Sequence, residues 1–415
     1  MNHHPESSLI TPASADAFGP HVLPFGVFST ADRSPRIGVR LHESVLDLVV
    51  LSERDGLDLR ELFDCGSLDR LLAAGPAVWV RAREATLRWA AELEDSPTDH
   101  AIIPLAKVQM HLPFTVADFV DFFSSREHVE NMSRILRPGQ PLLQPNWLRI
   151  PVAYHGRAAS VVVSGTTVTR PWGVLPPQGE DAPAFGPTQR LDVEVELGFV
   201  VGVGSEPGAT IPVNQFREHV FGVVLVNDWS ARDIQAFEAV PLGAFLGKSF
   251  ATSIGAWVLP LDALESSRVA PPERVHEPEA YLRSTEEWGL DIDFELTLNG
   301  TVISRPSFAG MYWTPDQQLA HMTVNGAAAR TGDLYASGTI SAGLPENFGS
   351  LVELSRAGTQ SIVLNDGASR TFLEDGDTVS ITAVARGAGG QAIGLGDVSG
   401  TITGWNHPVN KEPMK

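Results

Sequence analysis

Short apolar runs rich in β-branched residues are the main pattern along this chain. Between about residues 22 and 60 the extended segments are PFGVFST, RIGVRL and SVLDLVVL. After residue 115, similar runs recur with turn-forming residues between them: ASVVVSGTTVT, LDVEVELGFVVGVG, VFGVVLVNDW, DFELTLNGTVIS, GDLYASGTIS and DTVSITAVARG. Runs of this kind are typical of β-strands. The pattern therefore predicts a mainly β protein of the α+β class.

Helical character is concentrated in residues 67–94, SLDRLLAAGPAVWVRAREATLRWAAELE, with an interruption near Gly75-Pro76. A polar linker, DSPTDHA, follows, and we place a domain boundary between about residues 95 and 115. The expected organisation is a loose tail at 1–20, an N-terminal domain at 21–115 and a larger domain at 116–415. The prolines and charges of residues 266–284 predict an exposed loop.

Composition and charge narrow the class of protein. The chain has 415 residues, 43% of them hydrophobic, and a formal net charge of −20. This charge argues against a nucleic-acid partner and against an anionic membrane surface, because both would repel the chain. The single cysteine, Cys65, excludes an internal disulfide. With no apolar leader and no run near the roughly 18 residues of a membrane span, we expect a cytoplasmic protein.

Residues 118–128, DFVDFFSSREH, crowd acidic, aromatic and imidazole side chains into one segment. Read as a helix, the segment places Asp121 and His128, seven positions apart, on one face. Phe119, Phe122 and Phe123 would anchor the helix in a core. The segment then either presents a carboxylate and an imidazole to one cavity or is an ordinary amphipathic helix with a solvated face.

Two further acidic segments flank predicted strands. In LDVEVEL, residues 191–197, alternation places Asp192, Glu194 and Glu196 on one face, where their charges repel. Such a face is either solvated or requires a cation. In VFGVVLVNDW, Asp228 stands where a buried strand ends, either as a functional group or as a cap of the next turn.

Residues 230–253 add basic and amide groups to this picture. SARD, residues 230–233, has the form of a capping box that starts a helix. Arg232 and Gln235 are three apart on that helix, so both could face one ligand. The glycine-punctuated loop PLGAFLGKSFATS contains Lys248, and ASGTISAGLPENFGSLVEL contains Thr339 and Glu353. Each of these two loops is a weak signal by itself.

Several long segments, taken in order, resemble the fumarylacetoacetate hydrolase family. The segments that carry the resemblance are PNWLRIPVAYHGRAASVVVSGT, DVEVELGFVVG, VNDWSARDIQ, VPLGAFLGKSF, MYWT, VNGAAARTGDLYASGTIS and ENFGSLVELS. The resemblance implies a small SH3-like barrel at the N-terminus, followed by a mixed β-sandwich roll. It also implies a homodimer.

The resemblance also implies roles for individual residues. The implied metal carboxylates are Asp121, Glu194, Glu196 and Asp228. His128 matches the catalytic base, and Glu353 the glutamate that orients it. The implied oxyanion group is Arg232, Gln235 and Lys248; the implied substrate contacts are Arg137, Tyr154, Gln235 and Thr339, together with positions 123 and 239. Lys248 and Thr252 match residues near a second, magnesium-like ion.

Positions 123 and 239 depart from the family pattern. The family has substrate-contacting tyrosines where this chain has Phe123 and Ala239, neither of which can donate a hydrogen bond. The metal site and the base are unaffected by this difference. The identity of the diketo-acid substrate is the part of the assignment that it leaves open.

The implied reaction is metal-dependent hydrolysis of fumarylacetoacetate to fumarate and acetoacetate, the last step of tyrosine and phenylalanine breakdown. Four carboxylates favour Ca²⁺, because Mg²⁺ usually takes only one or two; Mg²⁺ and Mn²⁺ remain alternatives. A related enzyme acting on an acylpyruvate or another diketo acid is the nearest competing hypothesis. A non-catalytic, calcium-stabilised β protein is the more distant one. An activity assay with and without chelator separates the last hypothesis from the other two.

Overall fold

The structure, a computed structural model, describes residues 15–405 except 95, 97, 178 and 180–181. Most of the tail predicted at 1–20 lies outside the described residues. Its described end is not loose: Ala15–Phe18 forms a short 3-10 helix, and the Phe18 side chain is buried. Arg40 lies over the Phe18 ring at 3.5 Å. None of the helices in the described ranges is long and apolar enough to cross a membrane.

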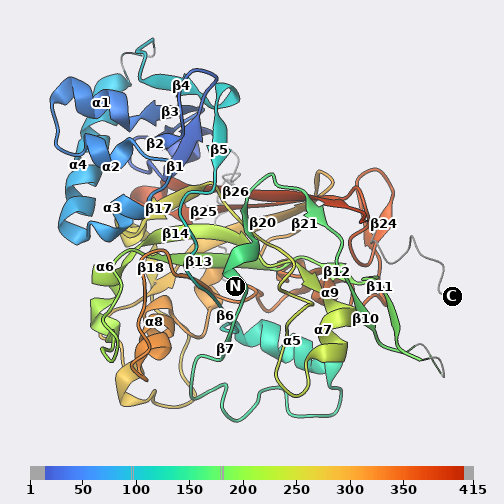
Figure 1. Cartoon of the computed structure of the whole chain (residues 1–415). Helices are drawn as coiled ribbons and strands as arrows, with labels where there is room; N and C mark the ends of the chain where they lie inside the picture. The colour runs from blue at the N-terminus through green and yellow to red at the C-terminus, as the bar shows by residue number, and fades with distance from the viewer. Residues whose placement is uncertain (1–14, 95, 97, 178, 180–181, 406–415) are drawn as a thin grey trace, which may run out of the picture.

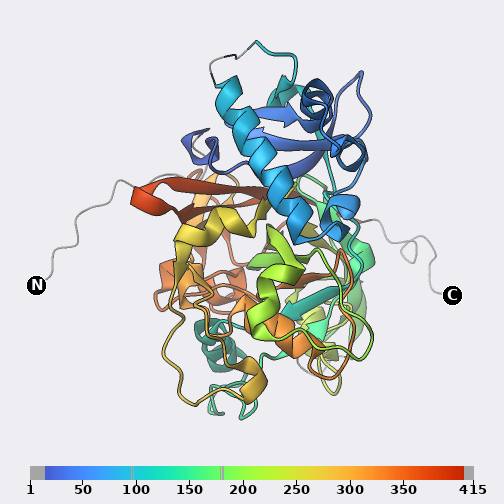
Figure 2. The same cartoon turned by 90° about the vertical axis from the view of Figure 1, so that its left-hand side faces the viewer.

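The N-terminal part is an antiparallel sheet flanked by helices. Its strands are β1 (Phe25–Ser29), β2 (Arg36–Leu41), β3 (Ser44–Asp47), β4 (Ile102–Pro104) and β5 (Gln109–His111). Its helices are α1 (Leu48–Asp55), α2 (Arg60–Phe63), α3 (Asp69–Ala73) and α4 (Pro76–Leu93). Figure 2 shows α4 lying across the strands, and its side chains share a core with β1 and β2.

The predicted helical segment at 67–94 is confirmed, with its interruption where α3 ends and Pro76 begins α4. The extended prediction for SVLDLVVL holds only for its first half. Asp47 accepts hydrogen bonds from the backbone N–H groups of Val49 and Val50, so a helix begins at Leu48.

One large sheet contains strands of both the N-terminal part and the rest of the molecule (Figure 1). Its strand order is β4-β3-β2-β1-β17-β14-β13-β22-β6-β7. Its later strands are β6 (Phe119–Phe122), β7 (Ala153–His155), β13 (Val195–Val201), β14 (Val220–Asn227), β17 (Trp257–Pro260) and β22 (Leu334–Ala336). β16 (Thr252–Ile254) pairs with β14 and with β8 (Val161–Val163).

A second sheet has the order β21-β20-β25-β26-β9. Its strands are β9 (Val168–Thr169), β20 (Ile292–Leu298), β21 (Thr301–Ser304), β25 (Thr378–Arg386) and β26 (Ala392–Thr403). β25 and β26 lie beside β14, and the apolar faces of β13, β14, β20 and β25 form one buried core. The described chain is thus a strand-rich mixture of α and β structure, as the sequence predicts.

Short elements complete the described chain. Two-stranded sheets pair β10 (Trp172–Leu175) with β11 (Ala184–Pro187), β12 (Leu191–Asp192) with β15 (Ser230–Ala231), β18 (Arg268–Val269) with β19 (Gly289–Leu290), and β23 (Ile362–Val363) with β24 (Ser369–Arg370). The remaining α-helices are α5 (Arg126–Leu136), α6 (Phe216–His219), α7 (Arg232–Glu238), α8 (Pro315–Thr323) and α9 (Leu351–Leu354). The 266–284 segment is only partly exposed, because Leu282 is fully buried.

The prediction of one helix across residues 118–128 is wrong. Phe119–Phe122 is a strand, paired in parallel with β22 on one side and antiparallel with β7 on the other. Helix α5 begins only at Arg126, where the Ser125 side chain accepts a hydrogen bond from the His128 backbone N–H. Strand partners from distant segments satisfy the backbone here and outweigh the local helical spacing.

Candidate metal centre and active site

Four carboxylates converge where strands of the large sheet end. Asp121 lies on β6, Glu194 just before β13, Glu196 within β13 and Asp228 just after β14. One oxygen from each lies within 4.8 Å of the others, and all four side chains are at most 5% exposed. The Asp228 backbone N–H donates to the Glu194 carbonyl at 3.3 Å, so neighbouring strand ends hold the group together.

The burial of these carboxylates decides between the alternatives left open for LDVEVEL. Glu194 and Glu196 do not lie on a solvated face, because they are 4% and 0% exposed. Asp192 is not part of this cluster. Strand β12 ends at Asp192, and its carboxylate accepts a hydrogen bond from Arg232. The acidic residues of this segment therefore have two roles: Glu194 and Glu196 belong to the carboxylate cluster, and Asp192 has a structural role outside it.

The cluster fits a divalent cation. Asp121 Oδ1 and both oxygens of Glu196 are buried without a hydrogen-bond partner in the described structure. Burial raises the pKa of both side chains well above the usual range, and the neighbouring carboxylates add to the effect on Glu196. These buried oxygens have no hydrogen-bond donor, and their negative charge is unfavourable in this environment. A bound cation would provide both a ligand contact and the opposite charge.

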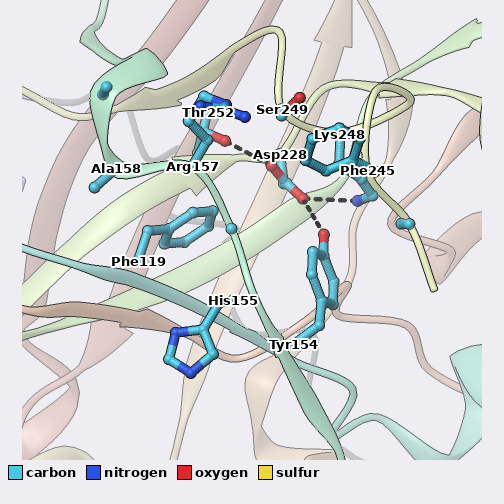
Figure 3. A pocket seen from close by; sticks show the side chains of 13 residues that line it. Phe119, Tyr154, His155, Arg157, Ala158, Asp228, Phe245, Lys248, Ser249 and Thr252 are labelled. Atoms are coloured by element: carbon cyan, nitrogen blue, oxygen red, sulfur yellow. Dashed lines mark hydrogen bonds and ion pairs between the residues drawn. The ribbon is translucent and has the colours of Figure 1, made fainter. Parts of the chain in front are cut away.

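Three side chains donate hydrogen bonds to Asp228 (Figure 3). Lys248 Nζ lies 2.7 Å from Asp228 Oδ2, and Thr252 Oγ1 donates to Oδ1 at 2.7 Å. The Tyr154 hydroxyl donates to Oδ2 at 3.4 Å. Asp228, Lys248, Thr252 and Tyr154 together line a cavity of about 370 Å³. The cluster is therefore next to a space of ligand size.

Lys248 also contacts Glu194. Burial opposes the positive charge of Lys248, but the carboxylates of Asp228 and Glu194 outweigh burial and raise its pKa. Lys248 is therefore a fixed cation that neutralises part of the cluster.

Arg232, at the start of α7, contacts the cluster, and Gln235 lies beside Arg232. Arg232 Nε donates to Asp192 at 2.7 Å, and Nη2 lies 2.7 Å from Glu194 Oε1. Arg232 Nη1 donates to Gln235 at 3.2 Å, which confirms that the two side chains lie together. The predicted capping box is wrong: Ala231 is the N-cap residue, and Ser230 Oγ donates instead to the Asp228 carbonyl.

His128 and Glu353 form a buried pair between α5 and α9. His128 Nδ1 lies 2.8 Å from Glu353 Oε2, and the two residues are 2% and 1% exposed. Glu353 also accepts hydrogen bonds from Asn131 at 2.9 Å, Ser341 at 2.9 Å and Ser350 at 2.7 Å. Burial opposes ionisation of Glu353, but the imidazole and these donors lower its pKa. An ionised acceptor at Nδ1 leaves Nε2 as the basic nitrogen.

The remaining predicted residues lie around this pair or at element ends. The Phe123 ring packs edge-on against the His128 ring, with 5.3 Å between ring centroids. Thr339 is buried after β22, and Ala239 caps the end of α7. Arg137 caps α5 and donates to Ser133 at 2.7 Å; within the described residues no contact joins it to the carboxylates.

Sequence reasoning missed the role of Asp192. Its carboxylate accepts from Arg232 and from the backbone N–H groups of Leu351, at 2.7 Å, and Val352, at 3.1 Å. One buried aspartate therefore fixes both Arg232 and the start of the helix that carries Glu353. The acidic alternation pointed to Asp192 but not to this role, which depends on contacts distant in sequence.

Comparison with known proteins matches nearly the whole chain. Residues 21–113 match the family model described as fumarylacetoacetase N-terminal, and residues 119–403 match fumarylacetoacetate hydrolase C-terminal. The chain is 44% identical to a fumarylacetoacetase of Homo sapiens over 416 residues, covering 95% of this chain and 98% of that protein. It is 42% identical to a fumarylacetoacetase of Arabidopsis thaliana, with the same coverage.

Solved structures agree at the level of the fold. A fumarylacetoacetate hydrolase from Exiguobacterium antarcticum superposes with a TM-score of 0.54 at 18% identity, covering 92% of this chain and 100% of that one. A maleylpyruvate hydrolase from Sphingobium has a TM-score of 0.51 at 16% identity with the same coverage. With both family models matched and full-length relatives above 40% identity, the chain belongs to the fumarylacetoacetate hydrolase family.

Proposed function

We propose that this protein is a metal-dependent hydrolase that cleaves 4-fumarylacetoacetate into fumarate and acetoacetate. The observation that carries the proposal is the buried His128–Glu353 pair beside four converging carboxylates. Burial opposes ionisation of Glu194, but the charges of Arg232 and Lys248, followed by His128, lower the pKa of that carboxyl. The relatives named fumarylacetoacetase, at 37–44% identity over nearly the whole chain, support the same substrate.

We propose that the carboxylates of Asp121, Glu194, Glu196 and Asp228 hold the metal. A cation bound there would supply Lewis-acid stabilisation of the negative charge that develops on the diketone oxygens. The all-oxygen, four-carboxylate donor set favours Ca²⁺ over Mg²⁺ or Mn²⁺. The second, magnesium-like ion near Lys248 and Thr252 stays a prediction, since both side chains here donate hydrogen bonds to Asp228.

The protein's own residues divide the remaining work. In the proposed reaction, His128 Nε2 takes a proton from the water that adds to the carbonyl carbon next to the fumaryl unit. Glu353 holds the imidazole through Nδ1 and stabilises the imidazolium. Arg232 and Lys248 place fixed positive charge near the oxyanion, with Gln235 beside Arg232. When the carbon–carbon bond breaks, its electron pair goes to the carbon that becomes the methyl group of acetoacetate, and this carbon takes up a proton that balances the one His128 removed from water.

The proposal also covers the substrate and the oligomeric state. The substrate is a small diketo acid, and we propose a homodimer on the strength of the family resemblance. A related acylpyruvate is the second candidate substrate, because Phe123 and Ala239 cannot donate the hydrogen bonds of the family's tyrosines.

A steady-state comparison tests the proposal. Purified enzyme supplied with Ca²⁺ is expected to have a higher kcat/KM for fumarylacetoacetate than for a short acylpyruvate. His128→Ala should lower kcat about 10²- to 10⁴-fold without changing metal content, because only the base is removed. His100→Ala is the matched control, since the His100 side chain is 74% exposed.

The reverse substrate order would replace fumarylacetoacetate by the second candidate. No turnover of either compound by metal-loaded enzyme would refute the catalytic function. A His128 variant with more than about half of wild-type turnover would refute the base assignment.

A further inference from the structure

The loop that delivers Lys248 to the carboxylates has little hydrophobic support of its own. Residues 239–247 join the end of α7 to Lys248. Their large apolar side chains are mostly exposed: Val240 is 87%, Leu242 97% and Phe245 58% exposed, and Phe245 also lines the cavity beside Lys248. Apolar burial, the usual stabiliser of a surface loop, is therefore small here. Other contacts must fix the conformation of this loop.

The carboxylate of Glu238, the last residue of α7, supplies those contacts. Its oxygens accept backbone N–H hydrogen bonds from Phe245 at 2.7 Å, Leu246 at 3.0 Å and Gly247 at 2.8 Å. Hydrogen bonds to an ionised acceptor are stronger than neutral ones. These three successive N–H groups belong to the three residues that immediately precede Lys248.

The same turn is pressed onto the other end of α7. The Gly247 carbonyl accepts from the Ala231 N–H at 2.8 Å. A Cβ at Gly247 would lie 2.7 Å from the backbone nitrogen of Gln235, so only glycine allows this approach. The turn is therefore held against the helix at a fixed distance just before Lys248.

This arrangement joins the three basic and amide groups of the site into one unit. Arg232, Gln235 and Glu238 are spaced by three residues along α7. Arg232 contacts Glu194 directly, Gln235 lies beside Arg232, and Glu238 places Lys248, whose Nζ lies 2.7 Å from Asp228.

We propose that Glu238 is a positioning residue that acts through Lys248. Its role is to hold the loop so that the Lys248 ammonium lies at Asp228 and Glu194 in the reacting complex. This inference rests on the proposed hydrolase function and adds a residue to it.

A double-mutant cycle with Lys248 tests the inference. Glu238→Ala is expected to lower kcat for fumarylacetoacetate about 10- to 100-fold, since a misplacement of about 1 Å near the reacting groups costs up to about 10²-fold. KM should change less than about threefold. In a Lys248→Met background, the same substitution should cost less than about twofold, because the group it positions is already absent.

Two further variants keep the test decisive if Glu238→Ala is poorly folded. Glu238→Gln preserves the side-chain volume but turns one acceptor into a donor that faces the N–H groups, and Gly247→Ala displaces the turn from α7. Both should lower kcat in the wild-type background and have little effect beside Lys248→Met. Asp366→Ala is the matched control, because Asp366 accepts a backbone N–H from Ala368 in a different loop.

Equal losses in both backgrounds would show that Glu238 does not act through Lys248 and would overturn the inference. Unchanged kcat in Glu238→Ala, Glu238→Gln and Gly247→Ala would overturn it as well. Failure of the proposed function is a separate result, because the unmodified, metal-loaded protein would then not cleave fumarylacetoacetate at all.

Discussion

Replacing Glu353 by glutamine probes the catalytic pair with minimal change in shape. Glu353 Oε2 accepts from His128 at 2.8 Å, Ser341 at 2.9 Å and Ser350 at 2.7 Å, while Oε1 accepts from Asn131 at 2.9 Å. An amide has only one acceptor oxygen. Either its NH₂ group faces His128, which then must present Nδ1 as acceptor and lose the basic Nε2, or it faces the Asn131 amide.

The expected loss follows from these contacts. A hydrogen bond to a charged group contributes roughly 1.5–3 kcal/mol, which corresponds to about 10- to 150-fold in rate. Loss of the correct tautomer removes the general base and extends the range to about 10⁴-fold. We therefore expect kcat for fumarylacetoacetate to fall about 10- to 10⁴-fold, with metal content and KM little changed.

The assay is steady-state hydrolysis with elemental analysis of the same preparations. Glu346→Gln, which alters an exposed glutamate seven residues earlier, is the control and should retain wild-type kcat. A fall of less than about fivefold in Glu353→Gln would refute the assigned role of this carboxylate.

The same substitution has a pH-dependent effect on stability. The folded-state pKa of Glu353 is lowered relative to the unfolded chain, so the ionised Glu353 carboxylate stabilises the fold above the unfolded pKa of about 4.3. That stabilisation disappears as the pH falls through the lower, folded pKa. Chemical denaturation should therefore show a stability gap between wild type and Glu353→Gln at pH 7 that narrows below about pH 4.3. A gap that widens with acidity would contradict this sign.

Three further substitutions test other parts of the account. Glu196→Gln should abolish most metal binding, because it removes a buried charge with no other partner; full occupancy by elemental analysis would place Glu196 outside the site. Asp192→Asn should lower kcat at least about tenfold with metal retained, since Arg232 and the α9 backbone lose a shared charged acceptor worth roughly 1.5–3 kcal/mol per bond. Phe123→Tyr should raise kcat/KM for fumarylacetoacetate about 10- to 150-fold by restoring a donor to a charged group; a fall, together with better wild-type use of a short acylpyruvate, would favour the second substrate.

The sequence predicted the strand-rich fold and the α3–α4 helical segment because their patterns are local. Periodicity and the Gly75-Pro76 break depend on neighbouring residues only. The segment at 118–128 failed because its conformation depends on β22, which is more than 200 residues away along the chain. The helical spacing still identified Asp121 and His128 as candidate site residues, although Asp121 lies in a strand and His128 in a helix.

The candidate site was predictable to a different extent for each residue. Acidic side chains beside apolar strands are costly unless they are partnered, which made each carboxylate a candidate with a structural alternative; only the family resemblance joined the four into one metal site. Asp192 lies in the same alternation, yet its contacts with Arg232 and α9 appear only when distant segments fold together. Ser341, Ser350 and Glu238 carried no such sequence signal, since their roles come from hydrogen bonds in the folded chain.

Metal-dependent formation of the two products tests the central claim most directly. The protein is stripped with a chelator, titrated with Ca²⁺ and supplied with fumarylacetoacetate, while fumarate and acetoacetate are quantified separately. We expect no significant turnover after stripping, recovery on titration, and equimolar fumarate and acetoacetate at every point. Full activity in the stripped protein, or substrate loss without equimolar fumarate and acetoacetate, would contradict the account of this chain as a metal-dependent carbon–carbon hydrolase.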